Sequence, residues 1–222
     1  MPDIKSHKRV NDIFLASLER PALQWLAAHT PSWIGPDHMT VLGLIGSLII
    51  LIGYWQTNFN SAFLWLASLG FVINWYGDSL DGTIARFRRQ ERPVYGFFVD
   101  HTVDGISEVM VFLGLGLSPY VRFDLACLAL IGYLLLSVLV YIRTCVKGEF
   151  VISYGKLGPT EARLIAIGAN TLVFFIGNPQ WTIFNFTSSV YDWLVMVIVV
   201  ILFAIYMISS ISQAVILAKE GK

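Results

Sequence analysis

The sequence has few charged residues. Lys, Arg, Asp and Glu together make up 14% of the 222 residues, whereas 56% are hydrophobic, and the mean hydropathy is +0.67. Soluble domains usually contain about 25% charged residues, so this composition indicates an integral membrane protein. The formal net charge is zero. Because basic residues are not in excess, we expect no nucleic-acid partner.

Cysteine is also scarce, and its placement excludes a disulfide framework. The two cysteines, Cys127 and Cys145, fall in one expected helix, about 27 Å apart at about 1.5 Å per residue. That separation is far beyond disulfide reach, so both are expected as reduced packing residues. The N-terminus lacks an apolar core followed by a small-residue cleavage site, so no cleaved secretory signal is expected.

Long apolar runs, in contrast, are abundant. Six runs of about 18 residues or more can each cross a hydrocarbon core, at 39–57, 62–86, 95–118, 122–146, 160–177 and 190–218. Segment 11–29 mixes apolar with charged residues and predicts an amphipathic helix in the membrane interface, with a soluble cap helix as the alternative. The sequence thus predicts an all-α polytopic membrane protein, in which residues 1–222 form one domain of six transmembrane helices.

Lys and Arg are distributed unevenly between the two sides of this layout. Six spans put both termini on one side, and of the fifteen Lys and Arg only Arg122 falls on the other side. Cytoplasmic loops carry the excess of Lys and Arg, so both termini are expected in the cytoplasm.

Four aspartates interrupt two neighbouring spans at one expected depth. Asp78 and Asp81 lie near the end of the second span, and Asp100 and Asp104 near the start of the third. Spacings of three and four residues place each pair on one helical face, and antiparallel helices would set the pairs level with each other. Four carboxylates this close would repel one another and lose hydration without a counter-ion, so bound cations are expected.

The residue types favour a particular kind of cation and ligand. Carboxylates without a His or Cys pattern favour Mg²⁺ or Mn²⁺ over zinc, and two ions could clamp a displaced phosphate. Gly82 and Ala85 lie on the same face and would let a bulky ligand approach the backbone. Arg86, one turn further, would bind phosphate oxygens. Together these residues indicate a pyrophosphate site at the cytoplasmic side.

Residues 78–104 read D-x-x-D-G-x-x-A-R, then nine residues, then G-x-x-x-D-x-x-x-D. This pattern resembles the signature of the class I CDP-alcohol phosphotransferase (CDP-alcohol phosphatidyltransferase) family. The six-span layout and the interfacial helix are similar to that family as well. The segment "GPDHMT" at 35–40 is similar to the Pro-Asn-x-x-Thr start of the first span in many members, with Asp37 in place of Asn.

The resemblance implies roles for individual residues. Two divalent ions would be bound by four carboxylates, those of Asp78, Asp81, Asp100 and Asp104, and Asp104 would also be the general base. The cytidine nucleotide would contact Asp81, Gly82, Ala85 and Arg86. Gly96 would allow close packing at the start of the third span.

The implied reaction belongs to phospholipid biosynthesis. A phosphatidyl group would pass from CDP-diacylglycerol to the hydroxyl of a polar alcohol, and CMP would leave, in an enzyme that forms a homodimer. Gly114 and Gly116 would permit close helix contact. "FVDH" at 98–101 leaves open a different branch of the family, in which CDP-choline or CDP-ethanolamine is the donor and diacylglycerol the acceptor. Two more distant functions also stay open, that of an aspartate-rich membrane prenyltransferase and, among non-enzymes, that of a divalent-cation transporter.

Several residues near the signature carry less specific expectations. Arg143 and Arg163, at the cytoplasmic ends of the fourth and fifth spans, would bind an anionic acceptor or simply anchor the spans. Glu108 continues the aspartate face as a proton relay or a structural carboxylate. His101 points off that face and is expected to pack. The basic residues between the second and third spans, Arg88, Arg89 and Arg92, are expected to anchor anionic headgroups.

Overall fold

The computed structural model describes residues 8–10, 15–147, 149–151, 158–183, 186–219 and 221. Within these ranges the chain forms seven helices: α1 (Ala16–His29), α2 (Pro36–Gln56), α3 (Phe63–Phe87), α4 (Pro93–Leu117), α5 (Phe123–Lys147), α6 (Pro159–Ile176) and α7 (Val190–Lys219). Four short strands accompany them: β1 (Lys8–Val10), β2 (Glu149–Val151), β3 (Gln180–Ile183) and β4 (Phe186–Ser189). The predicted all-α fold is confirmed, and every helix lies within a few residues of its predicted range.

Proline and glycine determine where several helices begin and end. Pro36, Pro93 and Pro159 occupy the first turns of α2, α4 and α6, where a missing N–H costs no intrahelical bond. Gly177 ends α6 with a φ of 81°, a left-handed conformation that favours glycine. These boundaries are therefore local properties of the sequence.

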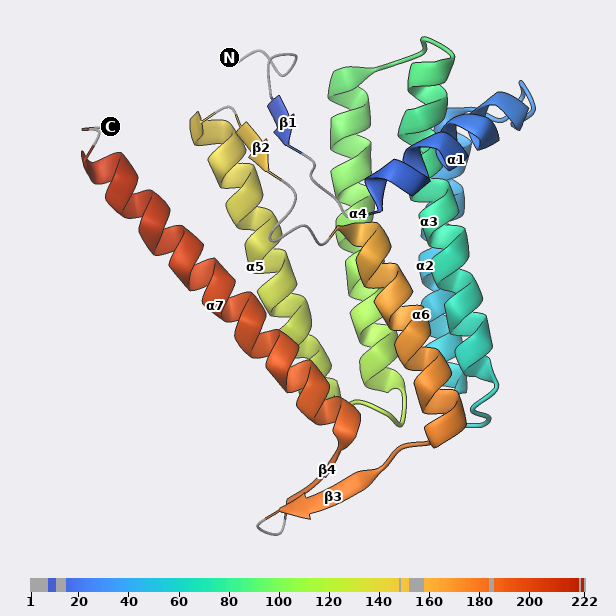
Figure 1. Cartoon of the computed structure of the whole chain (residues 1–222), viewed down its shortest axis with the longest axis vertical. Helices are drawn as coiled ribbons and strands as arrows, with labels where there is room; N and C mark the ends of the chain where they lie inside the picture. Colours follow the sequence, from blue (N-terminus) through green and yellow to red (C-terminus); the bar gives the residue numbers. More distant parts are fainter. Residues whose placement is uncertain are drawn as a thin grey trace.

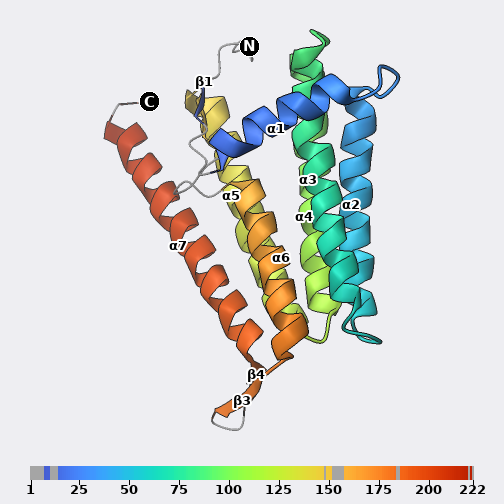
Figure 2. The same cartoon turned by 45° about the vertical axis from the view of Figure 1, so that its right-hand side comes forward.

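The helices α2 to α6 run side by side as an up-and-down bundle, and α7 leans away from it (Figure 1). The helix α1 lies across α3 at the end of the bundle where α5 ends and α6 begins. Turning the molecule by 45° keeps this arrangement (Figure 2). At the opposite end, in the connection between the fifth and sixth predicted spans, β3 pairs antiparallel with β4 as a hairpin. The strand β1 pairs in parallel with β2.

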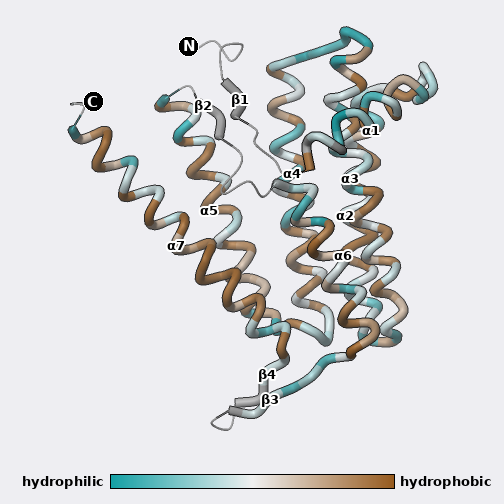
Figure 3. The backbone as a smooth tube through the Cα atoms, in the orientation of Figure 1, coloured by the Kyte–Doolittle hydropathy of each residue, from teal (hydrophilic) through white to brown (hydrophobic). Residues whose placement is uncertain are grey.

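Among the described residues, three helices, α2, α5 and α7, are long and apolar enough to cross a membrane by length and composition. Figure 3 shows that α7 is apolar along most of its length. Many of its large side chains are exposed, including Ile198, Ile201, Met207 and Ile208. Exposed apolar surface of this extent is suited to lipid, so the chain is an integral membrane protein. Six spans remain a prediction.

Glycines bring α2 and α3 into direct backbone contact. A Cβ on Gly46 would lie 2.8 Å from Asn74 Cα, and one on Gly53 would lie 2.6 Å from Ala67 N. A Cβ on Gly70 would likewise lie 2.7 Å from Ile50 Cγ1. No larger residue fits at these positions without separating the helices, so α2 holds α3 closely along its length.

The two glycines expected to permit helix contact between chains are used within the chain. A Cβ on Gly114 of α4 would lie 2.8 Å from Leu51 Cα of α2, and one on Gly116 would lie 2.9 Å from Ala126 Cβ of α5. Neither glycine is therefore available to a second copy. The two cysteines both lie on α5 as free thiols, as predicted.

Candidate active site

The close contact between α2 and α3 continues to the first aspartate. A Cβ on Gly77 would lie 2.5 Å from Met39 O and closer still to Gly43 N, so the backbones touch beside Asp78. This contact fixes the turn of α3 that carries Asp78 and Asp81 against the start of α2. Because side chains of α2 are then within reach, partners for the aspartates come from outside the signature.

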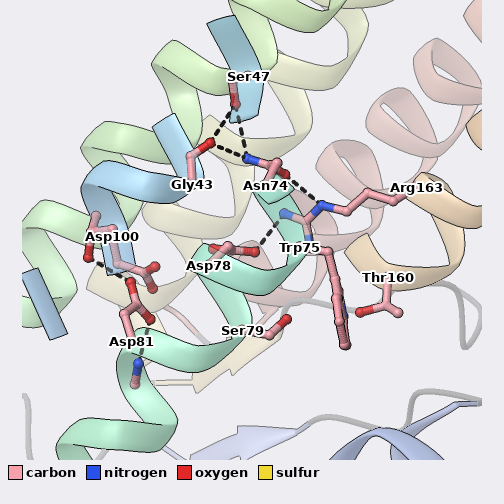
Figure 4. Close-up of polar contacts among 12 residues, drawn as sticks. Gly43, Ser47, Asn74, Trp75, Asp78, Ser79, Asp81, Asp100, Thr160 and Arg163 are labelled. Carbon is pink, nitrogen blue, oxygen red and sulfur yellow. Dashed lines mark hydrogen bonds and ion pairs between the residues drawn. The ribbon is translucent and has the colours of Figure 1, made fainter. Parts of the chain in front are cut away.

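Asp78 is held by the first turn of α6. Arg163 Nη2 donates to Asp78 Oδ2 at 2.6 Å, and Arg163 Nε donates to Asn74 Oδ1 at 2.8 Å. Asn74 in turn donates to Gly43 O at 3.0 Å and to Ser47 Oγ at 2.9 Å (Figure 4). The predicted acceptor residue Arg163 thus lies in the site, with its guanidinium paired to an aspartate.

Asp81 is held by α2. Thr40 Oγ1 donates to Asp81 Oδ2 at 2.7 Å, and the N–H of Gly82 donates to Asp81 Oδ1. Thr40 closes the "GPDHMT" segment, so the signal that could have identified this partner was present in the sequence. A hydroxyl donor at this position orients the carboxylate without neutralising its charge.

The second pair of aspartates faces the first across the gap between α4 and α3. Asp81 interacts electrostatically with Asp78 and Asp100, and Asp104 interacts with Asp78 and Asp100. Figure 4 shows Asp78, Asp81 and Asp100 close together, although they come from two helices. The structure therefore brings together the four aspartates that the sequence placed at one depth.

One group of side chains has the spacing of a metal site. Ligand atoms of Asp100, His101 and Asp104 lie within 4.8 Å of one another. His101 Nδ1 lies 3.5 Å from Asp100 Oδ2, and its ring is stacked on Tyr141 with centroids 5.4 Å apart. Oxygen-rich donors of this kind fit a hard divalent cation. His101 therefore lies closer to the carboxylates than its predicted packing role implies.

The predicted nucleotide residues lie together on the last turns of α3. The guanidinium of Arg86 folds over Gly82, since a Cβ there would lie 3.2 Å from Arg86 Nη1. Arg86 Nη2 donates to Thr83 Oγ1 at 3.3 Å, and the Arg86 side chain is otherwise exposed. Ala85 precedes it as a small, partly buried residue. An exposed arginine beside a bare backbone can receive a phosphate.

A carboxylate on α1, which sequence reasoning missed, joins this helix to the site. Glu19 Oε1 accepts from Trp75 Nε1 at 2.8 Å, Ser79 Oγ at 3.3 Å and Thr160 Oγ1 at 2.8 Å. These donors belong to α3 and α6, the helices that carry Asp78 and Arg163. Glu19 therefore fixes α1 over the same end of the bundle as the aspartates.

Deeper in the bundle, α4 and α5 form the wall below Asp104. Glu108 lies beside Asp104 and Tyr133, and its Oε2 atom is buried with no hydrogen-bond partner among the residues that the structure describes. Tyr141 contributes the ring that stacks on His101. The wall is therefore polar and aromatic rather than aliphatic.

Three expectations are corrected by these contacts. Arg88 donates to the carbonyls of the α1–α2 connection, those of Thr30, Pro31, Ser32 and Ile34. Arg92 pairs with Asp37 and lies over the ring of Tyr95, so two predicted headgroup anchors bind protein groups. A Cβ on Gly96 would meet nothing within 4 Å, so no close packing occurs there within the described chain.

Arg143, the other predicted acceptor residue, lies apart from the aspartates. It lines a crevice between α5 and α7 together with Leu139, Ile142 and Gln213. Side chains two residues apart on a helix point in directions that differ by about 200°. Arg143 therefore faces away from Tyr141, whose ring contacts His101 of α4. Its predicted role at the acceptor remains a prediction.

Comparison with known proteins agrees with this geometry. Residues 33–205 match the CDP-alcohol phosphatidyltransferase family. The chain is 31% identical to cholinephosphotransferase 1 of Bos taurus over 180 residues, covering 74% of this chain and 43% of that protein. For human cholinephosphotransferase 1 the identity is 30% over 179 residues, with coverage of 74% and 43%.

An archaeal relative matches a shorter part. Archaetidylinositol phosphate synthase of Pyrococcus horikoshii is 31% identical over 104 residues, which is 47% of this chain and 52% of that protein. The chain spans less than half the length of the cholinephosphotransferases that it matches. Since the family match covers the aspartate site and most of the bundle, the chain belongs to the CDP-alcohol phosphatidyltransferase family.

Proposed function

We propose that this protein is a membrane enzyme of phospholipid synthesis, which transfers a phosphatidyl group from CDP-diacylglycerol to the hydroxyl of a polar alcohol and releases CMP. The observation that carries the proposal is the meeting of four aspartates from α3 and α4, inside a chain of this family. Charged groups within membrane helices are costly and belong to functional sites by default.

The carboxylates of Asp78, Asp81, Asp100 and Asp104 would hold two divalent cations, Mg²⁺ or Mn²⁺. The spacing of Asp100, His101 and Asp104 supports a metal on the α4 side. Bound there, a divalent cation would neutralise the charge of phosphate oxygens during the reaction. Arg163 now neutralises Asp78 from the other side of the site, and Thr40 orients Asp81.

The nucleotide would lie along Asp81, Gly82, Ala85 and Arg86, with the Arg86 guanidinium on its phosphates. Asp104 would accept the proton of the alcohol hydroxyl. The hydroxyl oxygen then forms a bond to the phosphorus that carries diacylglycerol, and the bond from that phosphorus to the bridging oxygen breaks. CMP leaves with the electron pair of that bond.

We infer that α2 to α7 all cross the membrane, while α1 lies in the interface and both termini and the active site are cytoplasmic. α3 and α4 are less apolar because they carry the site, yet they expose Trp65, Leu69, Val72 and Ile106. In a variant without Cys127 and Cys145, a cysteine at Arg122 should be labelled only from the side opposite to one at Lys219. A homodimer is part of the proposal on the strength of family resemblance alone.

The acceptor is open within this reaction class. Arg163 is engaged by Asp78, and Arg143 faces α7, so an anionic acceptor would need Arg163 to leave its partner. Serine, choline and inositol carry no phosphate and avoid that cost. Binding of the acceptor by Arg143 or Arg163 stays a proposal.

The reaction is tested by CMP release from purified protein in detergent. CDP-diacylglycerol and Mg²⁺ or Mn²⁺ are mixed with glycerol phosphate, inositol, inositol phosphate, serine or choline in separate assays. CMP release with one alcohol supports the proposal and names the acceptor. Release only from CDP-choline or CDP-ethanolamine with diacylglycerol overturns the donor assignment, and the similarity to cholinephosphotransferases is the reason to include that assay. Ion flux in vesicles without CMP release would indicate a transporter.

A further inference from the structure

The helices α5 and α7 are packed together at one end only. They meet closely along the half of α5 nearer the β3–β4 hairpin, where a Cβ on Gly132 would lie 3.1 Å from Leu202 Cβ and 3.3 Å from Phe203 Cε2. Toward the opposite end, where α5 and α7 both finish, the two helices separate, as Figures 1 and 2 show. The separation leaves a crevice of about 220 Å³ between them.

The lining of this crevice is amphipathic. From α5 it includes the apolar side chains of Leu139, Ile142 and Val146. From α7 it includes Tyr206, Ser210, Gln213 and Leu217, whose spacing places them on one face of the helix. Two cations, Arg143 and Lys147, lie on the last turns of α5 and so at the end of the crevice where the helices separate.

These two cations are available to a ligand. No ion pair is found for Arg143 or Lys147 among the residues that the structure describes. Both side chains are partly buried against the crevice rather than fully extended into solvent. Two cations beside an apolar slot are complementary in charge and polarity to an anionic amphiphile.

A polar atom in the same place has an unmet bonding capacity. The side-chain Oε1 of Gln213 is buried and has no hydrogen-bond partner within the described chain. A buried polar atom left without a partner is costly, which indicates that something else bonds there. A headgroup hydroxyl can donate to this oxygen, and after rotation of the amide its N–H groups can donate to a phosphate oxygen.

We propose that the crevice between α5 and α7 binds one anionic phospholipid of the surrounding bilayer. The phosphate lies between Arg143 and Lys147, the headgroup bonds Gln213, and one acyl chain follows Ile142, Leu139 and Leu217 into the bilayer. The site is separate from the aspartates, because Arg143 lies on the side of α5 opposite to Tyr141. The inference rests on the membrane location in the proposed function, and it gives Arg143 a role different from the acceptor binding proposed for it there.

The test measures lipid binding rather than activity. Native mass spectrometry of the detergent-purified chain, titrated with phosphatidylglycerol or with phosphatidylcholine, counts bound lipids and gives their affinities. One variant is Arg143→Gln with Lys147→Gln, and a second is Ser210→Trp, which fills the crevice and leaves the charge unchanged. The matched control is Arg20→Gln with Arg122→Gln, which removes the same charge from exposed positions outside the crevice.

The wild type is expected to bind one phosphatidylglycerol more tightly than phosphatidylcholine. Each cation near an anionic headgroup is worth roughly fivefold in affinity, so the double glutamine variant should lose about 30-fold. Ser210→Trp should lose the tight site as well, and the control variant should keep it. Unfolding temperatures confirm that each variant is folded.

Four results would overturn the proposal. The first is equal affinity for the two lipids. The second is an equal loss of phosphatidylglycerol affinity in the double variant at Arg143 and Lys147 and in the control. The third is displacement of the bound lipid by glycerol phosphate at a similar concentration, which would make the crevice a site for a small polar anion. Loss of a dimer with Ser210→Trp, without loss of lipid, would make a second copy the occupant and would also overturn it.

Discussion

Replacing Arg163 by Gln tests how the aspartate site is held before any metal binds. Arg163 Nη2 and Asp78 Oδ2 lie 2.6 Å apart, and the two side chains are only 15% and 24% exposed. A pair of similar length, Arg122 with Asp124 at 2.5 Å, is 40% and 59% exposed. The chain thus supplies its own control for the effect of burial.

The two variants should differ in stability. An exposed ion pair contributes about 0–1 kcal/mol, whereas breaking a buried pair costs about 3–5 kcal/mol. Partial exposure of Arg163 and Asp78 places the loss for Arg163→Gln at about 2 kcal/mol, because solvent screens the charge that remains. For a chain of this length that loss lowers the unfolding temperature by about 4–8 °C, and Arg122→Gln should lower it by less than about 4 °C.

Mg²⁺ should reduce the difference in stability between Arg163→Gln and the wild type. Arg163 occupies Asp78 Oδ2, which the variant leaves free for a cation, and a ligand that binds only the folded state stabilises it. Thermal unfolding in detergent is measured with EDTA and with saturating Mg²⁺, and the gain with Mg²⁺ should be larger for Arg163→Gln than for wild type. An equal gain, or equal destabilisation by the two glutamine variants, would refute the reasoning.

Three further changes follow from the same geometry. Thr40→Val, which removes the donor to Asp81, should raise the Mg²⁺ concentration for half-maximal CMP release about 10–100-fold, whereas Thr40→Ser should not; equal values would exclude the orienting role. Gly77→Ala should cost about 1–3 kcal/mol in thermal unfolding by separating α2 from α3, while Gly168→Ala, where a Cβ meets nothing within 4 Å, should be neutral or stabilising. Asp78→Ala should abolish Mg²⁺-dependent binding of CDP-diacylglycerol, and unchanged affinity would remove Asp78 from the metal site.

The helices and the depth of the aspartates could be predicted because both depend on local pattern. Apolar runs, prolines at helix starts and the three- and four-residue spacings are visible in one dimension. The predicted helix ranges differ from those in the structure by a few residues, and the two pairs of aspartates do face each other. The strands β1 and β2 were not predicted, because their pairing joins segments that lie far apart in the sequence. The hairpin of β3 and β4 was not predicted either, although the two strands are neighbours in the sequence.

The partners of the site residues could not be predicted in the same way. Thr40, Glu19 and Arg163 reach the site only because α1, α2 and α6 are rotated toward α3, and rotation is decided by packing across helices. The glycines that make the contacts between α2 and α3 cannot be told apart from other small residues in the sequence. For the same reason the position of Arg143 beside α7 could not be predicted, because it depends on the rotation of α5.

Asp104 is the residue on which the proposed transfer depends most directly, since it alone would remove the hydroxyl proton. The decisive measurement compares wild type with Asp104→Asn in two assays, CMP release in a single turnover and Mg²⁺-dependent binding of CDP-diacylglycerol. CMP release is expected to fall by about 10²–10⁴-fold, while binding stays within a few-fold. CMP release at the wild-type rate would contradict the proposed role of Asp104 and the transfer that depends on it.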